Sequence, residues 1–585
     1  MSCKHFFSNA NSLVPSYLKG FVRVNPDLSL VEEERVVYNP HHSKKKVSLV
    51  SGGGSGHEPA WSSYVGDGML TAAVNGDIFA SPSAKQVMAG IDASPSDEGI
   101  ILLITNYTGD KLHFGLACEK AKTHLKNKKV TVLSSTDDVA LGRQNTGMVG
   151  RRGLAANVVL IKLLGAAAEA GKPYEYCVEL GKAINDNMAT MGSSLDHCHV
   201  PGRINHEAVP EDEVILGMGI HNEKGFKSVS PIPPADELIK TTLDYLLDPN
   251  DENRNYLNNR QKGDKFVLLV NNFGGVSALE LGALTNEAID QLESTWDITP
   301  HKIFSGHFEA SLNGPGFSVS LVNVSAISRD TKIDVQELVD FLEAPTSAPG
   351  WPGSRPNVNK TPEFPYKPFL TTTQLDETKN CKIDPEVAKK TILQAAHRAI
   401  ESEPKLTEWD MVMGDGDCGE TVKEICQDIT KKVNNGLTDS GNLLAILHDI
   451  IASVENMGGT LGAIIAIFLS AFTAELESFK EVSSDAFAAS AKAGIEALFH
   501  HTGARVGDRT VMDTLIPFCT KLHETSSFKE SVTAAKEGAE YSAKCKAKFG
   551  RATYVQAGQE GVTEIPDPGA WALYEVVQGI QDALN

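Results

Sequence analysis

The feature that most constrains this chain is a proline-dense stretch near its middle. Seven prolines lie between positions 344 and 369. Because proline fixes φ and lacks an amide hydrogen, so dense a run cannot continue a helix or a central strand, and it forms an extended, semi-rigid spacer instead. We therefore expect two folded parts, residues 1–343 and 383–585, joined by a linker over residues 344–382.

The part before the linker has the pattern of an α/β fold. Short runs rich in β-branched and other apolar residues alternate with helical stretches and glycine turns. The run at residues 100–104 is apolar on both faces, which is typical of a strand covered by helices on each side. Strands are expected at residues 47–50, 100–104, 130–133, 214–216, 266–270 and 317–322.

The part after the linker has a helical pattern almost throughout. Asp384 followed by Pro385 is typical of a helix start, and apolar residues recur at helical spacing from Ile392 onward. Asp567 followed by Pro568 predicts the start of a last helix. No strand is expected after position 382, so this part is predicted to be all-helical, with its functional groups in the connections between helices.

Charge and composition disfavour several classes of function. The chain carries 54 Lys and Arg against 75 Asp and Glu, a net charge of −21, which repels nucleic-acid phosphates and anionic lipids. The longest apolar run, residues 461–472, is too short for a membrane span, and the N-terminus lacks the apolar core of a signal peptide. Nine scattered cysteines fit a reducing compartment. We expect a cytoplasmic protein without a nucleic-acid or membrane partner.

An acidic, glycine-rich turn follows position 409. Asp410, Asp415 and Asp417 fall within eight residues, and two glycines between them allow a tight turn. Two unit charges about 4 Å apart repel by about 4 kcal/mol at an effective dielectric near 20, so converging carboxylates need a cation. The spacing is not that of an EF-hand, and oxygen ligands of this kind suit Mg²⁺ together with substrate phosphates. A solvated acidic turn is the alternative interpretation.

Two further glycine-rich connections occur in the same half, at residues 457–463 and 503–510, and each opens a helical run. Free amides at helix N-termini bind anions, and Arg505 and Arg509 would help to neutralise phosphate. With the acidic turn, these connections predict a metal–nucleotide site at one end of a helical bundle. The alternative is that each glycine marks only a helix cap or a close helix contact.

In the first half, three expected strands run into glycine-bearing segments that carry polar side chains. Residues 51–59 match neither the dinucleotide fingerprint nor the P-loop. The three segments deliver His57, Asp110 and His221, and ligands of open α/β sheets bind beyond the carboxyl ends of strands. A shared pocket is one interpretation, and separate turn-forming or hydrogen-bonding roles are the other. The run Asp196-His-Cys-His is not expected to bind metal, because neighbouring residues on a strand alternate faces and no complementary pair lies at ligand spacing.

Taken in order, these stretches resemble the single-chain ATP-dependent dihydroxyacetone kinases, also called glycerone kinases. The match extends over nearly the whole chain and rests on residues 51–59, 106–110, 217–221, 414–419, 457–463, 507–510 and 567–570. The resemblance implies a substrate domain of two α/β lobes over residues 1–343. It also implies an ATP-binding domain over residues 383–585, built as a barrel of antiparallel helices.

The resemblance also implies roles for the substrate half. The family's substrate histidine falls on His221, where it adds to the ketone carbonyl as a hemiaminal, while His57 and Asp110 hold and activate the hydroxyl that is phosphorylated. The implied substrate-binding positions are Gly53, Gly54, Ser55, Gly56, His57, Asp110 and His221.

For the nucleotide half, the resemblance implies ATP held with two Mg²⁺ ions. The family's metal-binding aspartates fall on Asp410, Asp415 and Asp417. The implied nucleotide-binding positions are Asp415, Asp417, Cys418, Gly419, Gly459, Thr460, Leu461, Gly507, Arg509, Thr510, Asp567, Pro568 and Gly569.

The implied activity is phosphorylation of dihydroxyacetone, and of glyceraldehyde, by a homodimer that exchanges domains between its chains. The chain departs from the family at three positions. Leu461 stands where serine is common, Thr105 where many members have lysine before Asn-Tyr, and Lys224 where proline is usual. Two alternatives stay open: a metal-dependent lyase that cyclises FAD, as an animal member of the family also does, and a ketose-binding regulator with weak kinase activity.

Overall fold

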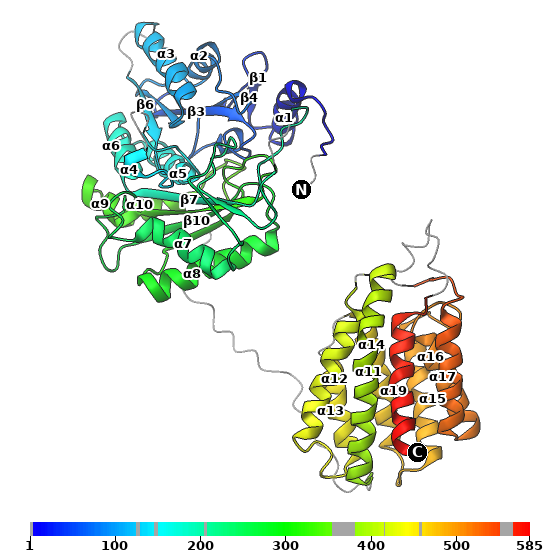
Figure 1. Cartoon of the computed structure of the whole chain (residues 1–585). Helices are drawn as coiled ribbons and strands as arrows, with labels where there is room; N and C mark the ends of the chain where they lie inside the picture. Colours follow the sequence, from blue (N-terminus) through cyan, green and yellow to red (C-terminus); the bar gives the residue numbers. More distant parts are fainter. Residues whose placement is uncertain are drawn as a thin grey trace. The chain divides into compact units, whose positions relative to one another are not determined.

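The computed structural model describes residues 4–124, 129–145, 150–203, 208–353, 381–414, 416–455, 459–549 and 565–585. The chain divides into two compact units, residues 1–365 and 366–585. The first contains both sheets and the second contains helices, as Figure 1 shows. The predicted fold class is therefore confirmed, while the predicted limits of the linker remain a prediction.

The first sheet of the α/β unit has six strands in the order β1-β2-β4-β3-β5-β6. Strands β4, β3, β5 and β6 pair in parallel. Strands β2 and β1 continue the sheet beyond β4 as antiparallel pairs. The strands are β1 (Ser29–Val31), β2 (Val36–Tyr38), β3 (Ser48–Ser55), β4 (Ala72–Ile78), β5 (Ile100–Thr105) and β6 (Val130–Ser135).

The second sheet also has six strands, in the order β11-β10-β12-β7-β8-β9, but most of its pairs are antiparallel. Only β10 and β11 pair in parallel. The strands are β7 (Met188–Ser194), β8 (Val214–Leu216), β9 (Lys227–Val229), β10 (Phe266–Asn272), β11 (Lys302–Gly306) and β12 (Gly316–Asn323).

All six strands expected from the sequence are present, and six others were not expected. Three of the unexpected strands, β1, β2 and β9, have only three residues each. The strand β7 consists of Met, Ala, Thr, Gly and Ser, so its sequence lacks the β-branched apolar run by which buried strands are usually found.

A helix that is buried on all sides packs between the two sheets. Every residue of α5 (Ala156–Glu169) from Ala156 to Ala168 is buried. It shares one core cluster with Leu49 and Leu103 of the first sheet and with Leu269 of the second, as expected for a helix enclosed in a core. The remaining helices of the unit are α1 (Ala10–Val24), η1 (Ser62–Tyr64), α2 (Ala84–Asp92), α3 (Thr108–His124), α4 (Gly142–Asn145), α6 (Tyr174–Asp186), α7 (Ala235–Leu247), α8 (Ala278–Trp296), α9 (Val324–Thr331) and α10 (Val335–Glu343).

The first residues of the predicted linker pack on the α/β unit. The Gly350 amide donates to the Ser63 carbonyl over 2.7 Å, and the Trp351 ring is buried against Phe304 at a centroid distance of 4.7 Å. Residues 344–353 are thus held by the unit that precedes them, whereas the Cys381 carbonyl, at the other end of the predicted linker, accepts from the Leu443 amide of the helical unit.

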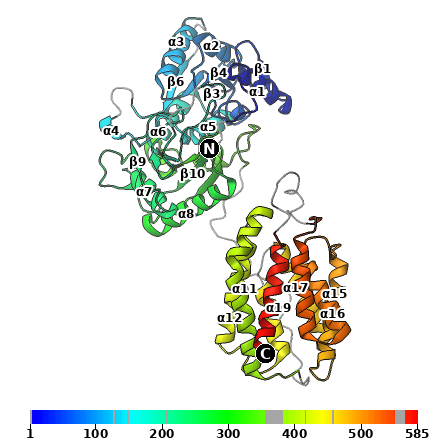
Figure 2. The same cartoon turned by 45° about the vertical axis from the view of Figure 1, so that its right-hand side comes forward.

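The second unit is a bundle of helices that run side by side, as Figures 1 and 2 show. Its helices are α11 (Pro385–Met413), α12 (Cys418–Asn434), α13 (Leu443–Glu455), α14 (Gly459–Leu476), α15 (Ser484–His501), α16 (Met512–Thr525), α17 (Phe528–Ser542) and α19 (Pro568–Leu584). The predicted caps are confirmed: the Asp384 and Asp567 side chains accept hydrogen bonds from the first turns of α11 and α19. The helices surround an apolar cavity of about 670 Å³. Within the described ranges, every helix is too short or too polar to cross a bilayer.

Candidate functional site

Strand β3 carries the first candidate residue to the centre of the α/β unit. The sequence predicted a strand ending at position 50 and a turn beginning at 51; instead β3 continues through the glycines to Ser55. Close packing explains the glycines, because a Cβ on Gly53 would lie 2.9 Å from Trp61 Nε1 and one on Gly54 would lie 2.8 Å from the Ala80 amide nitrogen. Gly56 then turns the chain with φ of +101°, which favours glycine.

His57 follows this turn and is buried, with 2% of its surface exposed. Its Nδ1 lies 2.8 Å from the carbonyl oxygen of Ala310, in the β11–β12 connection. A carbonyl oxygen only accepts, so Nδ1 carries the proton and donates it. Burial, with a smaller contribution from His221, lowers the pKa of His57 to about 3. His57 is therefore neutral, and its Nε2 presents a lone pair.

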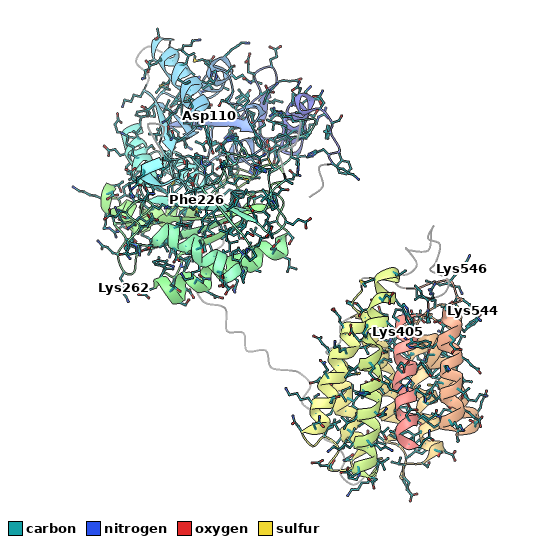
Figure 3. All side chains as sticks on the ribbon, viewed as in Figure 1. Asp110, Phe226, Lys262, Lys405, Lys544 and Lys546 are labelled. Carbon is teal, nitrogen blue, oxygen red and sulfur yellow. The ribbon has the colours of Figure 1, made fainter. Side chains whose placement is uncertain are left out.

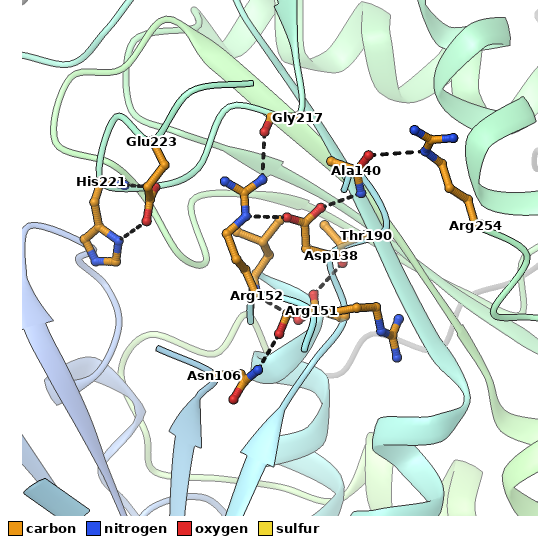
Figure 4. A network of polar contacts seen from close by, with 12 residues as sticks. Asn106, Asp138, Ala140, Arg151, Arg152, Thr190, Gly217, His221, Glu223 and Arg254 are labelled. Carbon is orange, nitrogen blue, oxygen red and sulfur yellow. Dashed lines mark hydrogen bonds and ion pairs between the residues drawn. The ribbon is translucent and has the colours of Figure 1, made fainter. Parts of the chain in front are cut away.

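That lone pair faces the second candidate residue. His221 Nε2 lies 3.0 Å from His57 Nε2, although the two residues follow strands of different sheets. On the other side of its ring, His221 Nδ1 lies 2.9 Å from Glu223 Oε1, and the His221 amide donates to Glu223 Oε2 over 3.0 Å. Figure 4 shows the two contacts to Glu223. The edge-to-face ring of Tyr107, 4.6 Å away between centroids, packs beside the imidazole.

These contacts determine where the protons lie on His221. Burial would raise the pKa of Glu223, but its hydrogen bonds to His221, the His221 charge and the Arg152 charge outweigh burial and lower the pKa to about 2. Glu223 is thus an ionised acceptor for Nδ1–H. Since His57 Nε2 also accepts, the arrangement that satisfies all contacts places a proton on each nitrogen of His221.

Asp110, the third candidate, lies in the first turn of α3 inside the α/β unit, where Figure 3 labels it. The residue is 5% exposed, and its Oδ1 has no hydrogen-bond partner among the described residues. Burial raises its pKa to about 6, against the opposing effects of a hydrogen bond from Ser81 and the charge of His221. A carboxyl group that titrates near neutral pH is suited to accept a proton in catalysis.

Two residues of this site were not found from the sequence. Glu223 follows His221 by two positions, and a carboxylate so close to a candidate histidine is a signal that could have been used. Ala310 contributes only a backbone carbonyl from a loop 253 positions away from His57, and no sequence pattern marks such a contact. The run that includes Cys198 instead supports the His221 loop, since Cys198 and Asn222 exchange two hydrogen bonds.

The acidic turn lies between α11 and α12 of the helical unit. Asp410 Oδ2 accepts from the amides of Gly416 and Cys418, each over 3.1 Å. Asp417 is exposed and precedes α12, without a capping hydrogen bond from its side chain. Asp415 lies outside the described residues.

The last helix begins next to this turn. Asp567 Oδ1 accepts from the Ala570 amide over 2.8 Å and caps α19. Burial, with smaller contributions from Asp513 and Asp410, raises the pKa of Asp567 to about 7 against the opposing charge of Arg509. Burial and the charges of Asp410, Asp567 and Asp417 raise the pKa of the Cys418 thiol to about 12. Negative charge therefore converges here, and an oxygen-rich, acidic set of this kind fits Mg²⁺.

Leu461, in the first turn of α14, belongs to the same end of the bundle. A Cβ on Gly569 would lie 3.4 Å from Leu461 Cδ1 and 3.6 Å from Val511 Cβ. The starts of α14, α16 and α19 thus meet at this end of the bundle, while their role in nucleotide binding stays a prediction. Thr460 is exposed, and Gly459 is the first residue of α14.

The arginine-bearing connection before α16 differs from the expectation of free amides. The amides of Gly507 and Thr510 donate to the two carboxylate oxygens of Asp513, over 2.5 and 2.7 Å. The Arg509 side chain is buried and donates to the Ile565 carbonyl over 2.7 Å. In this structure the amides are therefore engaged by Asp513, and Arg509 supports the segment that leads to Asp567.

Comparison with known proteins assigns each part of the chain to a described domain. Residues 19–350 match the Dak1 domain, and residues 412–582 match the DAK2 domain. The chain is 40% identical to dihydroxyacetone kinase from Pichia angusta, over all of this chain and 99% of that protein. It is also 40% identical to dihydroxyacetone kinase 1 of Saccharomyces cerevisiae, over the full length of both.

A solved structure aligns with both parts of the chain. The native dihydroxyacetone kinase of C. freundii aligns over 100% of both chains with a TM-score of 0.65 and 26% identity. A second structure of that enzyme, in complex with AMP-PNP and Mg²⁺, aligns with a TM-score of 0.64. The fold and the order of its parts thus define a two-domain Dak1–DAK2 kinase. The chain belongs to the dihydroxyacetone kinase family.

Proposed function

We propose that this protein phosphorylates dihydroxyacetone, and glyceraldehyde, with ATP, and that it holds the substrate as a hemiaminal on His221. The observation that carries the proposal is the 3.0 Å contact between His57 Nε2 and His221 Nε2, with Glu223 bound to the far side of the His221 ring. This arrangement supplies a nucleophilic nitrogen, an acceptor for its proton and a fixed counter-charge. A covalent tether also suits a three-carbon substrate, which is too small to be held by apolar contact. Correct orientation of bound reactants lowers the activation barrier of a reaction by about 7–11 kcal/mol.

The capture step adds the His221 Nε2–H bond across the substrate C=O. Nε2 transfers its proton to His57 Nε2, and the freed lone pair bonds to the carbonyl carbon. The C=O π electrons move to oxygen, which takes up the proton from His57. The ring retains its Nδ1 proton and its positive charge, which Glu223 neutralises before and after the reaction. Glycerol has no carbonyl group and is therefore excluded by chemistry rather than by size.

Asp110 then accepts the proton of the terminal hydroxyl as that oxygen attacks the γ-phosphorus. Phosphoryl transfer depends mainly on positioning and on neutralisation of charge. Asp410, Asp415 and Asp417 would hold Mg²⁺, as two ions, and the bound metal would neutralise the phosphates of ATP. The helix-start segments that contain Thr460, Leu461 and Gly569 would contact the nucleotide.

The test is ADP release measured by a coupled assay with dihydroxyacetone, glyceraldehyde and glycerol in parallel. The two carbonyl compounds should support turnover, and glycerol should not. His221→Ala should lower kcat/KM by several orders of magnitude and remove the protein mass adduct of one triose. His301→Ala, which removes a histidine of the same unit outside this site, is the control. Unchanged kinetics and an intact adduct in His221→Ala would reject the proposal.

We further propose a homodimer in which the helical unit of one chain serves the α/β unit of its partner. The test mixes two variants with impaired activity, His221→Ala and Asp417→Asn, after brief unfolding. Exchange of chains should restore activity, since each mixed dimer contains one complete pair of sites. Mixtures that remain inactive although mixed dimers form would show that each chain serves itself.

A second candidate function is the cyclising cleavage of FAD. The chain is 31% identical to the mouse protein named triokinase/FMN cyclase, over all of this chain and 99% of that protein. Incubation of FAD with Mn²⁺ or Co²⁺ should then yield AMP and the cyclic flavin phosphate. The other alternative, a ketose-binding regulator, predicts the triose adduct without ADP release.

A further inference from the structure

We infer that Arg152, held by Asp138, is a positioning residue for the covalent step: it fixes the loop that carries His221 and supplies the positive charge that faces Glu223. This inference rests on the proposed function and concerns the same site. Arg152 lies outside the strand ends and glycine-bearing segments from which the sequence predicted the substrate residues.

The contacts of Arg152 lie directly beneath the His221 loop, as Figure 4 shows. Its Nη2 donates to the carbonyl oxygen of Gly217 over 2.7 Å, at the point where β8 ends and the loop begins. Its Nε donates to Asp138 Oδ2 over 2.6 Å. The guanidinium therefore joins the base of the loop to a carboxylate that belongs to a different segment.

Asp138 is itself fixed by the backbone around it. Its side chain is 1% exposed, against 11% for the Arg152 side chain. Its Oδ1 accepts from the Ala140 amide over 2.8 Å, and its own amide donates to the Arg152 carbonyl over 3.1 Å. A buried charge pair with hydrogen bonds on both members has a defined geometry, and removal of one partner leaves the other charge uncompensated.

Arg152 also faces Glu223. A Cβ built on Gly219 would lie 1.9 Å from Glu223 Oε2 and 2.7 Å from Arg152 Nη1, so both charged groups lie against the same glycine. The positive charge of Arg152 helps to keep the pKa of Glu223 low. Charges thus alternate from Asp138 through Arg152 and Glu223 to His221. Each member restricts the position of the next, and the series ends at the Nδ1 proton that the covalent step requires.

The residue before Arg152 reaches the other substrate segment. Asn106 Nδ2 donates to the Arg151 carbonyl over 2.6 Å, and Asn106 begins the segment that leads to Asp110. The dipeptide at positions 151 and 152 therefore contacts both loops from which the substrate groups project. A change at Arg152 should alter the orientation of the imidazole more than the affinity for ATP, which is expected to bind in the helical unit.

A purely structural ion pair is the competing explanation, and the pH profile separates the two. The charged and titratable groups that surround the His221 ring are His57, Glu223, Asp110, Tyr107 and Arg152. Removal of the guanidinium favours the protonated form of Glu223, the carboxylate that must accept from His221 Nδ1 in the covalent step. The acid limb of kcat/KM for dihydroxyacetone should then move to higher pH, an effect that simple loss of stability does not produce.

The experiment compares Arg152→Gln, Arg152→Lys and the control Arg254→Gln in the full-length protein. Arg254 is a partly buried arginine that donates to the Ala140 carbonyl and packs on Phe226. We expect Arg152→Gln to lower kcat/KM for dihydroxyacetone by at least tenfold, to shift the acid limb to higher pH and to leave KM for ATP within twofold. Arg152→Lys keeps the charge but not both contacts. It should therefore restore the wild-type position of the acid limb, while its KM for dihydroxyacetone should be higher than that of the wild type. Arg254→Gln should leave the acid limb in place.

The inference is overturned if folded Arg152→Gln keeps the wild-type kcat/KM and acid limb. If Arg152→Gln does not fold, wild-type KM for dihydroxyacetone in Arg152→Lys overturns it equally. His221→Ala, assayed in parallel, distinguishes failure of the proposed function from failure of the role given to Arg152. Retained activity in His221→Ala rejects the proposed function, whereas its loss together with unaltered Arg152 variants rejects only the role of Arg152.

Discussion

His57 and His221 meet through their Nε2 atoms at 3.0 Å, and each ring is held from its opposite side, His57 by the Ala310 carbonyl and His221 by Glu223. The Ala310 carbonyl accepts the Nδ1 proton of His57, and Glu223 accepts the Nδ1 proton of His221. His57 Nε2 is the third acceptor, so the proton between the rings is carried by His221. The nucleophile is consequently stored in a protonated form, and loss of that proton precedes attack on a carbonyl group.

The first prediction concerns pH. Activity should fall on the acid side, because Asp110, with a pKa raised to about 6, must be ionised to accept the hydroxyl proton. A plot of kcat/KM for dihydroxyacetone between about pH 5 and about pH 8 should therefore rise with pH. At saturating dihydroxyacetone the rate reports phosphoryl transfer, so the pH profile of kcat should also show the acid limb that titration of Asp110 produces. A flat profile over this range would contradict the role given to Asp110.

Substitution of Asp110 by Asn should separate stability from function. A pKa raised from 3.8 to about 6 means that the ionised carboxylate destabilises the folded state by about 3 kcal/mol above pH 6, since one pKa step is about 1.4 kcal/mol. Asp110→Asn should therefore stabilise the α/β unit at neutral pH while it abolishes phosphoryl transfer. Below pH 3.8 the carboxyl is protonated in both states, so the gain should vanish as the pH falls from 6 to 4.

Hydrogen exchange of peptides from β3 and β5 in dilute urea measures this effect in the α/β unit alone. Asp92→Asn, at the end of α2, provides a matched substitution outside the site. A destabilised Asp110→Asn at neutral pH would mean that Asp110 is not held in an unfavourable environment.

A shared pocket for the two histidines was one of two interpretations of the sequence, and the groups that hold the two rings were not identified from it. His57 and His221 each follow a predicted strand, and the rule that ligands gather beyond strand ends brought them together. That rule refers to one parallel sheet, however, and β8 belongs to a second, mainly antiparallel sheet. The agreement depends on α5, which packs the two sheets together through a core that a single sequence does not reveal.

The groups that orient the rings were less accessible to prediction. The Ala310 carbonyl and the Arg152–Asp138 pair depend on contacts between segments that are distant in sequence. In the helical unit, by contrast, the caps Asp384 and Asp567 are local patterns of two residues, and both were predicted. A helix cap depends on residues that are neighbours in the sequence. A buried polar network depends on residues that become neighbours only when the whole chain has packed.

The acidic turn should be required for the nucleotide but not for ketone capture. Asp417→Asn removes an exposed carboxylate that makes no capping bond, so the helix start should persist. We expect at least a tenfold loss of kcat and weaker Mg²⁺-dependent binding of ATP in calorimetry. The triose adduct should persist in mass spectrometry, because it forms in the α/β unit. Asp428→Asn, on the same helix, is the control, and joint loss of ATP binding and adduct would refute the division of labour.

Replacement of Leu461 by serine should lower the stability of the helical unit and raise its affinity for ATP. The Leu461 side chain is partly buried against two apolar clusters and lies next to Gly569 at the start of α19. Loss of its buried methyl groups should destabilise the helical unit by about 1–3 kcal/mol. A hydroxyl at this helix start adds a hydrogen-bonding group where phosphate is expected, so KM for ATP should fall severalfold. Leu461→Ala removes the same apolar surface without the hydroxyl and should show the loss of stability alone. If the serine and alanine variants have the same KM for ATP, the leucine does not limit nucleotide binding, and its place beside Gly569 serves packing only.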